Sequence, residues 1–447
     1  MALDVLIGTI LVLGVMILVH EWGHFIVARM FGVRVDVFSI GFGPRLFGWK
    51  RGATDYRVSA LPLGGYVRMA GQDLSEVDSN DVAPTGAPDE LMSKPRWQRV
   101  LISFAGPAVN LIMPILLLTG VFAIKGLPYP SYLNNPAIIA GLNEADPLRS
   151  AGVVAGDKIV EVNGVATPTW EKAEEQLVGL KNQALVHFTV EHEGVSRKVE
   201  APGSVLAQID APFWYLPVPP IVGQVTKGLP ASRAGLKPDD MVVSVNGKRI
   251  ENWTLFVDSI KHSNGAALTT VLNRGGKLVS VVLQPESGPG EDGKPTFRIG
   301  VLGPKPIYAY KRVTFAASVQ NASEATWSGT QQLLGVVAKL FSGRVSVNQL
   351  QGVVRIAGQA GQAVHEGPSE VVNLMAMISL NLGILNLLPI PILDGGNILL
   401  LTLESLWRRD FSLAFKERFV QVGLVFLLLL FVVVMYNDVA SYLPFHT

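Results

Sequence analysis

The chain has 447 residues, of which 49% are hydrophobic and 16% are charged, and its mean hydropathy is +0.35. This composition predicts several membrane spans together with soluble domains, and a formal net charge of +1 gives no indication of a nucleic-acid or acidic partner. The absence of cysteine excludes disulfides, thiolate metal ligands and cysteine nucleophiles, so His, Asp or Glu would have to hold any metal.

Residues 1–31 form a first apolar segment with a metal-binding motif near its C-terminal end. On a helix, His20 and His24 project from one face, and Glu21 stands beside them as a candidate general base in the pattern H-E-x-x-H. Ionisable groups within a membrane helix usually mark a functional site, although these residues could also simply reach the lipid headgroups. The segment lacks the basic start and the cleavage site of a signal peptide, so we expect it to be retained.

Four segments are apolar over about 20 residues, the length that a membrane helix requires. They are residues 1–31, 100–124, 371–396 and 419–436. Lys and Arg gather in the connections 32–99 and 397–418, whereas none precedes the first span or follows the fourth. The positive-inside rule therefore places both connections in the cytoplasm, both termini and the long segment after the second span outside, and the histidines near the inner side.

The cytoplasmic connection 32–99 is predicted to contain a small membrane-associated β region. Residues 35–43 and 56–61 alternate in the manner of strands, and Gly41 and Gly43 are candidate supporting residues. An exposed strand beside a catalytic site could pair with an extended peptide, or the sheet could only brace the cytoplasmic face; the sequence favours neither. Residues 72–87 are predicted to be a flexible loop.

The second span contains Asn110 in the run Phe-Ala-Gly-Pro-Ala-Val-Asn. Buried amides commonly join membrane helices, so we expect Asn110 to support packing against the first span rather than to take part in the chemistry.

The soluble segment after the second span contains an internal repeat. Residues 151–164 match residues 234–247 without a gap, at a constant offset of 83 residues, with Gly turns and Asn-Gly turns at equivalent positions. Each copy predicts strands around one helix (170–180 and 253–263), a pattern that resembles PDZ domains. We therefore expect tandem PDZ domains at 137–202 and 220–285, which either bind peptide ends or serve as spacers. Residues 312–367 show helical periodicity but are too polar to span, so they are predicted to lie on the outer membrane surface or against the PDZ pair.

The third span ends in a sequence that predicts the second half of a metal site. Pro389 and Pro391 interrupt the helix, and irregular backbone at membrane depth persists only where protein or a wet cavity surrounds it. Asp394 is the expected third ligand, although Asp-Gly-Gly, with Gly395, would also suit a helix cap. Glu404 is a weaker ligand candidate. Asn386 could donate to a substrate carbonyl or could join helices.

The H-E-x-x-H motif in the first span, the N-x-x-P-x-P-x-L-D-G motif in the third, the four spans and the inserted PDZ pair together resemble the site-2 protease family of intramembrane zinc metalloproteases. The resemblance covers nearly the whole chain. It implies zinc bound by His20, His24 and Asp394, Glu21 as catalytic base, and Asn386, with Pro389 and Pro391, in substrate positioning. Two positions depart from the pattern common in such chains: Asn397 replaces a His, and Val353 replaces a Pro.

The resemblance also implies a place for the enzyme in regulated intramembrane proteolysis and in the envelope stress response. The expected substrates are a single-span anti-sigma factor, after a first protease has trimmed its outer domain, and signal-peptide remnants. The expected location is the bacterial inner membrane, and the PDZ pair would filter substrates by size. The alternatives are a membrane-anchored PDZ scaffold with a structural metal and, with less support, a metal transporter. The sequence leaves the oligomeric state open.

Overall fold

The computed structural model describes residues 2–72, 85–139, 147–178, 180, 184–201, 218–226, 228–289, 295–304, 307–342 and 352–440. The chain divides into two compact units, one of Met1–Leu127 with Arg312–Ala440 and one of Pro128–Lys311 with Ser441–Thr447. Most of the loop predicted at residues 72–87 lies outside the described residues, so that prediction stays open.

The first unit contains four helices that are long and apolar enough to cross a membrane: Leu3–Met30, Arg96–Lys125, Pro368–Asn386 and Ala414–Tyr436. The first of them consists of α1 (Ala2–Thr9), a π-helical turn (Ile10–Gly14) and α2 (Val15–Met30). The other three are α3 (Arg96–Lys125), α11 (Pro368–Asn386) and most of α13 (Leu413–Ala440). The four predicted spans are thus confirmed as candidate membrane helices; most ends differ by a few residues, but the third helix ends at Asn386, ten residues before the predicted end at residue 396.

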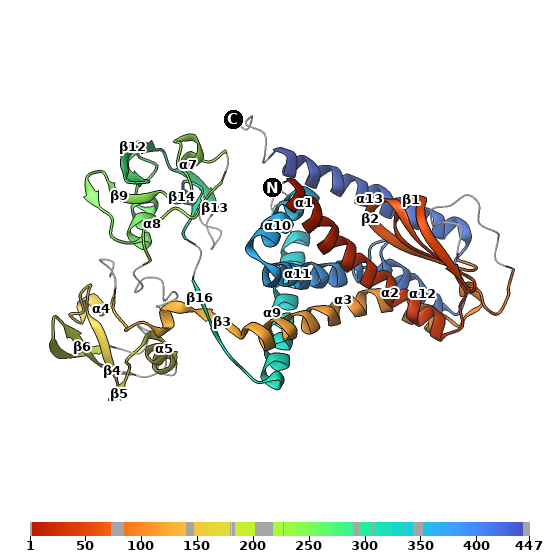
Figure 1. Cartoon of the computed structure of the whole chain (residues 1–447), viewed down its shortest axis with the longest axis horizontal. Coiled ribbons are helices and arrows are strands. Elements are labelled where there is room, and N and C mark those ends of the chain that lie inside the picture. Colours follow the sequence, from red (N-terminus) through yellow and green to blue (C-terminus); the bar gives the residue numbers. More distant parts are fainter. Residues whose placement is uncertain are drawn as a thin grey trace. The chain divides into compact units, whose positions relative to one another are not determined.

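Helix α3 is the centre of this unit and packs against both α2 and α11 (Figure 1). Small residues allow the close approach that membrane helices use. A Cβ atom on Gly23 of α2 would lie 2.6 Å from the Ala105 carbonyl oxygen, and a Cβ atom on Gly383 of α11 would lie 3.1 Å from the carbonyl oxygen of Pro107. The backbones of α2 and α11, which carry the two sequence motifs, therefore lie close to the backbone of α3.

The polar segment before the third span forms α9 (Phe315–Phe341) and α10 (Val353–Glu366). Helix α9 contacts α3 and α11, and α10 contacts α1, α11 and α13. Neither is among the candidate spans, as the sequence predicted, but both belong to the helical unit and pack on its spans. Both alternatives for this segment, the outer membrane surface or the PDZ pair, stay predictions.

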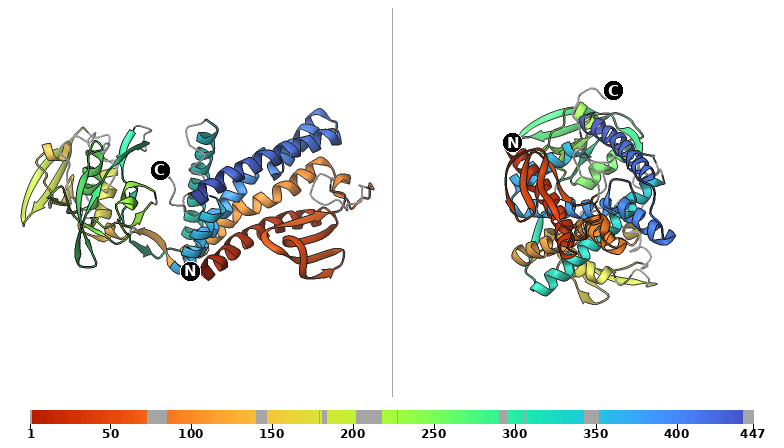
Figure 2. Two further views of the ribbon diagram at one scale, coloured as in Figure 1. Left: turned by 90° about the horizontal axis from the view of Figure 1, so that it is seen from above. Right: turned by 90° about the vertical axis from the view of Figure 1, so that its right-hand side faces the viewer.

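The predicted β region is a long, bent hairpin of β1 (Val35–Arg51) and β2 (Thr54–Met69) that lies against α2 (Figure 2). Phe38, in the first half of β1, pairs with both Tyr56 and Val67, so this half of β1 lies between the two halves of β2. The second half of β1 pairs with residues 54–59 of β2. Residues 65–69 therefore form one outer edge. The predicted strands exist but extend further, since a strand bent at Gly41 (φ +89°) and Gly43 (φ +85°) can continue past the turn.

After α11 the chain makes an irregular connection and then forms α12 (Asp394–Trp407). Helix α12 occupies the first half of the predicted connection 397–418; it packs against α3, and its residues Leu400 and Leu401 are buried. A short 3-10 turn (Leu91–Ser93) completes the described elements of this unit.

The second unit contains two four-stranded sheets with the same order, β5-β4-β6-β7 and β10-β9-β11-β12. The first is built from β4 (Lys158–Val162), β5 (Val165–Ala166), β6 (Val186–His192) and β7 (Val195–Ala201), with α4 (Pro147–Ser150) and α5 (Trp170–Val178). The second is built from β9 (Met241–Val245), β10 (Lys248–Arg249), β11 (Leu268–Arg274) and β12 (Lys277–Leu283), with α7 (Pro230–Arg233) and α8 (Trp253–Lys261).

Each sheet has its own hydrophobic core, around Trp170 and Phe188 in the first and around Phe256 and Leu272 in the second. Three small pairs of strands accompany them: β3 (Leu127–Pro130) with β16 (Tyr308–Lys311), β8 (Gln224–Val225) with β15 (Val301–Leu302), and β13 (Glu286–Pro289) with β14 (Pro295–Arg298); a 3-10 turn (Ser131–Asn134) follows β3. The duplicated strand order agrees with the sequence repeat, while the assignment of both copies to the PDZ type stays a prediction.

Candidate metal centre

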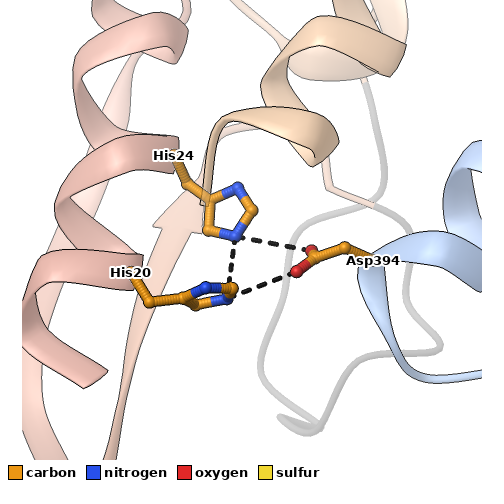
Figure 3. A group of neighbouring side chains, drawn as sticks. All are labelled: His20, His24 and Asp394. Carbon is orange, nitrogen blue, oxygen red and sulfur yellow. Dashed lines mark hydrogen bonds and ion pairs between the residues drawn. The ribbon is translucent and has the colours of Figure 1, made fainter. Parts of the chain in front are cut away.

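Three side chains from two distant parts of the sequence meet beside α3 (Figure 3). His20 and His24 project from successive turns of α2, with 7% and 8% of their surface exposed, and Asp394 is the first residue of α12. The two Nε2 atoms lie 3.2 Å apart, and the Asp394 carboxylate oxygens lie 3.3 Å from Nε2 of His20 and 3.4 Å from Nε2 of His24. Within the described residues, this is the group of His, Asp and Glu side chains that is arranged to hold a metal ion.

The spacing of these atoms fits zinc. Zinc lies about 2.0–2.2 Å from nitrogen and oxygen ligands in a tetrahedron, which places any two ligand atoms about 3.3 Å apart. In this structure the two Nε2 atoms lie 3.2 Å apart, and each of them lies 3.3–3.4 Å from one of the two Asp394 carboxylate oxygens, so these neighbouring atoms are spaced like pairs of zinc ligands. Three protein ligands leave the fourth position for water, as hydrolytic zinc sites require.

The second nitrogen of each imidazole is also engaged. Nδ1 of His24 lies 2.8 Å from the Ile102 carbonyl oxygen, which can only accept, so Nδ1 carries the proton and Nε2 presents its lone pair to the centre. Nδ1 of His20 lies 3.2 Å from the side-chain amide of Asn110, which is fully buried. Asn110 thus joins α3 to α2, as expected, and it does so through a proposed metal ligand.

Gly106 of α3 provides the space for both imidazoles. A Cβ atom at this position would meet Nε2 of His24 and would come within 2.8 Å of Cε1 of His20. The sequence analysis did not single out Gly106. The sequence signal that could have indicated Gly106 is the Gly-Pro pair in the second span, because a small residue in a membrane helix permits a neighbouring helix to approach closely.

The connection between α11 and α12 places Asp394. Helix α11 ends at Asn386, and Pro389 and Pro391 lie in the irregular backbone that follows. Ile392 adopts φ +80°, an unusual conformation for a β-branched residue, which costs about 1–3 kcal/mol and must be imposed by its surroundings. A Cβ atom on Gly395 would meet the carbonyl oxygens of Leu387 and Leu388, so a glycine is required where this connection folds onto α12.

Asn386 and Glu21 border the three ligand candidates. Nδ2 of Asn386 lies 3.3 Å from Nε2 of His20, so its amide faces the centre. The Glu21 carboxylate accepts a hydrogen bond from the backbone of Val67 on the outer edge of β2. A Cβ atom on Gly65 would lie 3.3 Å from Cγ of Glu21, which shows how closely this strand approaches the glutamate.

The remaining candidates do not contribute side chains to the centre. Glu404 is fully buried, but it accepts from Lys416 at 3.1 Å and from the Phe411 amide at 3.0 Å, so it joins α12 to the start of α13 and is not a ligand. Gly41 and Gly43 bend β1. Asn397 lies in the first turn of α12, and Val353 is the first residue of α10.

Comparison with known proteins gives one consistent result. The model of the family described as peptidase family M50 matches residues 8–430. The chain is 32% identical to the regulator of sigma-E protease RseP of Escherichia coli, over 96% of this chain and 97% of that protein. It is 31% identical to a Neisseria meningitidis protein named as a zinc metalloprotease (98% and 99% covered) and 30% identical to the protease eep of Enterococcus faecalis (98% and 99% covered).

Proposed function

This chain belongs to peptidase family M50 and is a site-2-type metalloprotease, and from this premise we propose that it cuts single-span membrane proteins at the centre formed by His20, His24 and Asp394. The observation that carries the proposal is the arrangement of these three side chains, whose facing nitrogen and oxygen atoms are spaced like neighbouring ligands of a zinc ion. The relatives named as zinc metalloproteases support zinc as the metal.

In the proposed mechanism, His20, His24 and Asp394 hold the metal and Glu21 moves the proton. Zinc would supply a Lewis acid that activates the attacking water and polarises the substrate carbonyl. Glu21 takes the proton of that water on its carboxylate and later gives it to the leaving amine. The Val67 amide orients the carboxylate for both steps, because a bound carboxylate rotates less than a free one.

We assign substrate positioning to the start of the connection between α11 and α12. The Asn386 amide faces the centre 3.3 Å from Nε2 of His20, where it can donate to the scissile carbonyl or to its neighbour. Pro389 and Pro391 keep the following backbone out of a helix, so the chain after Asn386 is irregular rather than helical. Gly395 supports this geometry by allowing the connection to fold onto α12.

The substrate strand is proposed to add to residues 65–69 of β2. Residues 65–69 pair with β1 on one side, and on the other side the Val67 amide reaches Glu21. An extended peptide paired with this edge would place its carbonyls next to the base, and pairing would offset the cost of unwinding a helical substrate. A disulfide forms between strands whose Cα atoms lie about 4.4–6.8 Å apart. The chain has no native cysteine, so Arg68→Cys should cross-link to single cysteines in the substrate with a period of two residues, and equal cross-linking at all positions would refute strand addition.

The substrates proposed for this chain are those that its resemblance implied: a single-span anti-sigma factor after a first cut, and signal-peptide remnants. The protein is a multi-pass membrane protein, and we place both termini and the two repeats on the outer side of the inner membrane. The repeats are proposed to be PDZ domains that filter substrates by the size of their outer part. Deleting residues 137–285 should then admit longer substrates.

The experiment that tests the proposed function uses the purified full chain and a single-span reporter with a shortened outer segment. Cleavage should stop when a chelator removes zinc and return when zinc is added, and His24→Phe should neither hold zinc at wild-type affinity nor cut. A scaffold with a structural metal predicts an intact reporter under all of these conditions, and that result would overturn the proposal.

A further inference from the structure

We infer that Asn110 is a positioning residue for the metal centre, and that its side-chain oxygen accepts a hydrogen bond from Nδ1 of His20. This inference rests on the proposed function, because it assigns Asn110 the task of preparing His20 to bind the metal. It goes beyond helix packing, since it specifies which nitrogen of His20 carries the proton and which atom of Asn110 faces it.

The first step concerns the environment of Asn110. The residue is 0% exposed, and its side-chain amide lies 3.2 Å from Nδ1 of His20. With the nitrogen turned toward the imidazole, Oδ1 is buried without a hydrogen-bond partner among the described residues. A half-turn of the amide would put the nitrogen in that place instead, so the choice between the two orientations depends on which atom Nδ1 of His20 requires.

The second step concerns the proton on His20. Nε2 of His20 faces His24, Asp394 and Asn386 at 3.2–3.3 Å, so it is the nitrogen that must present a lone pair to the metal. A neutral imidazole then carries its proton on Nδ1. Two hydrogen atoms would face each other if the Asn110 nitrogen pointed at Nδ1. Turning the amide by half a rotation exchanges its oxygen and nitrogen, and Oδ1 then accepts the Nδ1 proton.

The third step compares the two ligands. His24 obtains the same tautomer from the Ile102 carbonyl of α3, at 2.8 Å. His20 lies one turn away, opposite Asn110 of the same helix α3, and the side chain supplies the acceptor there. The backbone at Asn110 is itself held, because its carbonyl accepts from the Ser379 hydroxyl of α11 at 2.9 Å. Both histidines are therefore oriented from α3, one by a backbone oxygen and one by a side-chain oxygen.

Partners of this kind usually change metal affinity by about 10–100-fold when they are removed. The experiment measures the zinc affinity of the purified full chain by competition with a chelator, for wild type, Asn110→Leu and Asn110→Asp. Leucine fills a similar volume but cannot accept, whereas aspartate retains an oxygen acceptor and no donor. Asn373→Leu, on α11, is the matched control for loss of an asparagine amide, and size-exclusion chromatography checks folding.

We expect Asn110→Leu to weaken zinc binding by about 10–100-fold, and Asn110→Asp and Asn373→Leu to stay within about tenfold of wild type. Wild-type affinity in Asn110→Leu, or an equal loss in the control, would overturn the inference. A loss in Asn110→Asp as large as in Asn110→Leu would also overturn it, because the amide nitrogen would then be the essential atom. If Asn110→Leu fails to fold, the aspartate variant decides alone. Absence of zinc from the wild type would instead refute the proposed function.

Discussion

The substitution Gly106→Ala tests whether α3 leaves just enough space for the two histidines. The added methyl group would meet Nε2 of His24, and it would lie 2.7 Å from Cε1 of His24 and 2.8 Å from Cε1 of His20. Ordinary contacts begin at 3.4 Å, so the His20 ring must move by about 0.6 Å and the His24 ring, whose Nε2 is the nearest atom, must move further. Ligand distances in a metal site tolerate about 0.2 Å, and we therefore expect zinc affinity to fall by at least about 100-fold.

The same helix provides the matched control. A Cβ atom on Gly120 would have no atom within 4 Å, so Gly120→Ala adds the same methyl group to α3 without a clash. Zinc content of the purified proteins is measured by mass spectrometry after dialysis against a weak chelator, together with cleavage of the single-span reporter. Equal zinc content in Gly106→Ala and Gly120→Ala would refute the reasoning, because the histidines would then have room to spare.

Two further predictions concern residues away from the centre. Asp438 is fully buried and accepts hydrogen bonds from the backbone amides of Gly352, Val354 and Arg355 at 3.1–3.2 Å, so it caps the start of α10. Asp438→Ala should therefore destabilise the start of α10 by about 2 kcal/mol and speed hydrogen exchange there. Unchanged exchange in α10 would contradict the assignment of Asp438 as its cap. In the second unit, burial favours the neutral form of Asp240, but the Arg274 guanidinium, bonded to both carboxylate oxygens at 2.7 Å, outweighs it and holds the pKa of Asp240 below its usual 3.8. This pair therefore stabilises the fold above about pH 4 and loses its effect as the pH falls through the lowered pKa. Protection factors in β9 and β11, which are exchange rates corrected for the intrinsic rate at each pH, should fall between pH 6 and pH 3 in wild type and should change less in Asp240→Asn. An equal fall in both proteins would contradict this account.

The sequence predicted those parts of the fold that depend on local pattern. Apolar length alone located the four spans, and the spacing of His20 and His24 placed two candidate ligands on one face of a helix. The duplicated Gly and Asn-Gly turns predicted two similar sheets, which have the same strand order. Each of these features is encoded within a short stretch of chain, so periodicity and turn residues were sufficient.

Features that depend on contacts between distant segments could not be predicted in the same way. The sequence assigned residues 397–418 to the connection between two spans and did not indicate α12, which packs against α3 and buries Leu400 and Leu401. Glu404 was weighed as a weaker ligand candidate, and the structure places its carboxylate against Lys416 of α13. The importance of Gly106 depends on atoms of α2, and no pattern within the second span specifies where those atoms lie.

The most direct test of the central claim separates metal binding from catalysis at Glu21. Wild type and Glu21→Gln are compared in membranes for cleavage of a single-span substrate shortened on its outer side, and bound zinc is measured for both. We predict that Glu21→Gln holds zinc as wild type does, because His20, His24 and Asp394 are unchanged, and that cleavage stops because the base is lost. Equal cleavage by both proteins would contradict the assignment of Glu21 and the mechanism built on it.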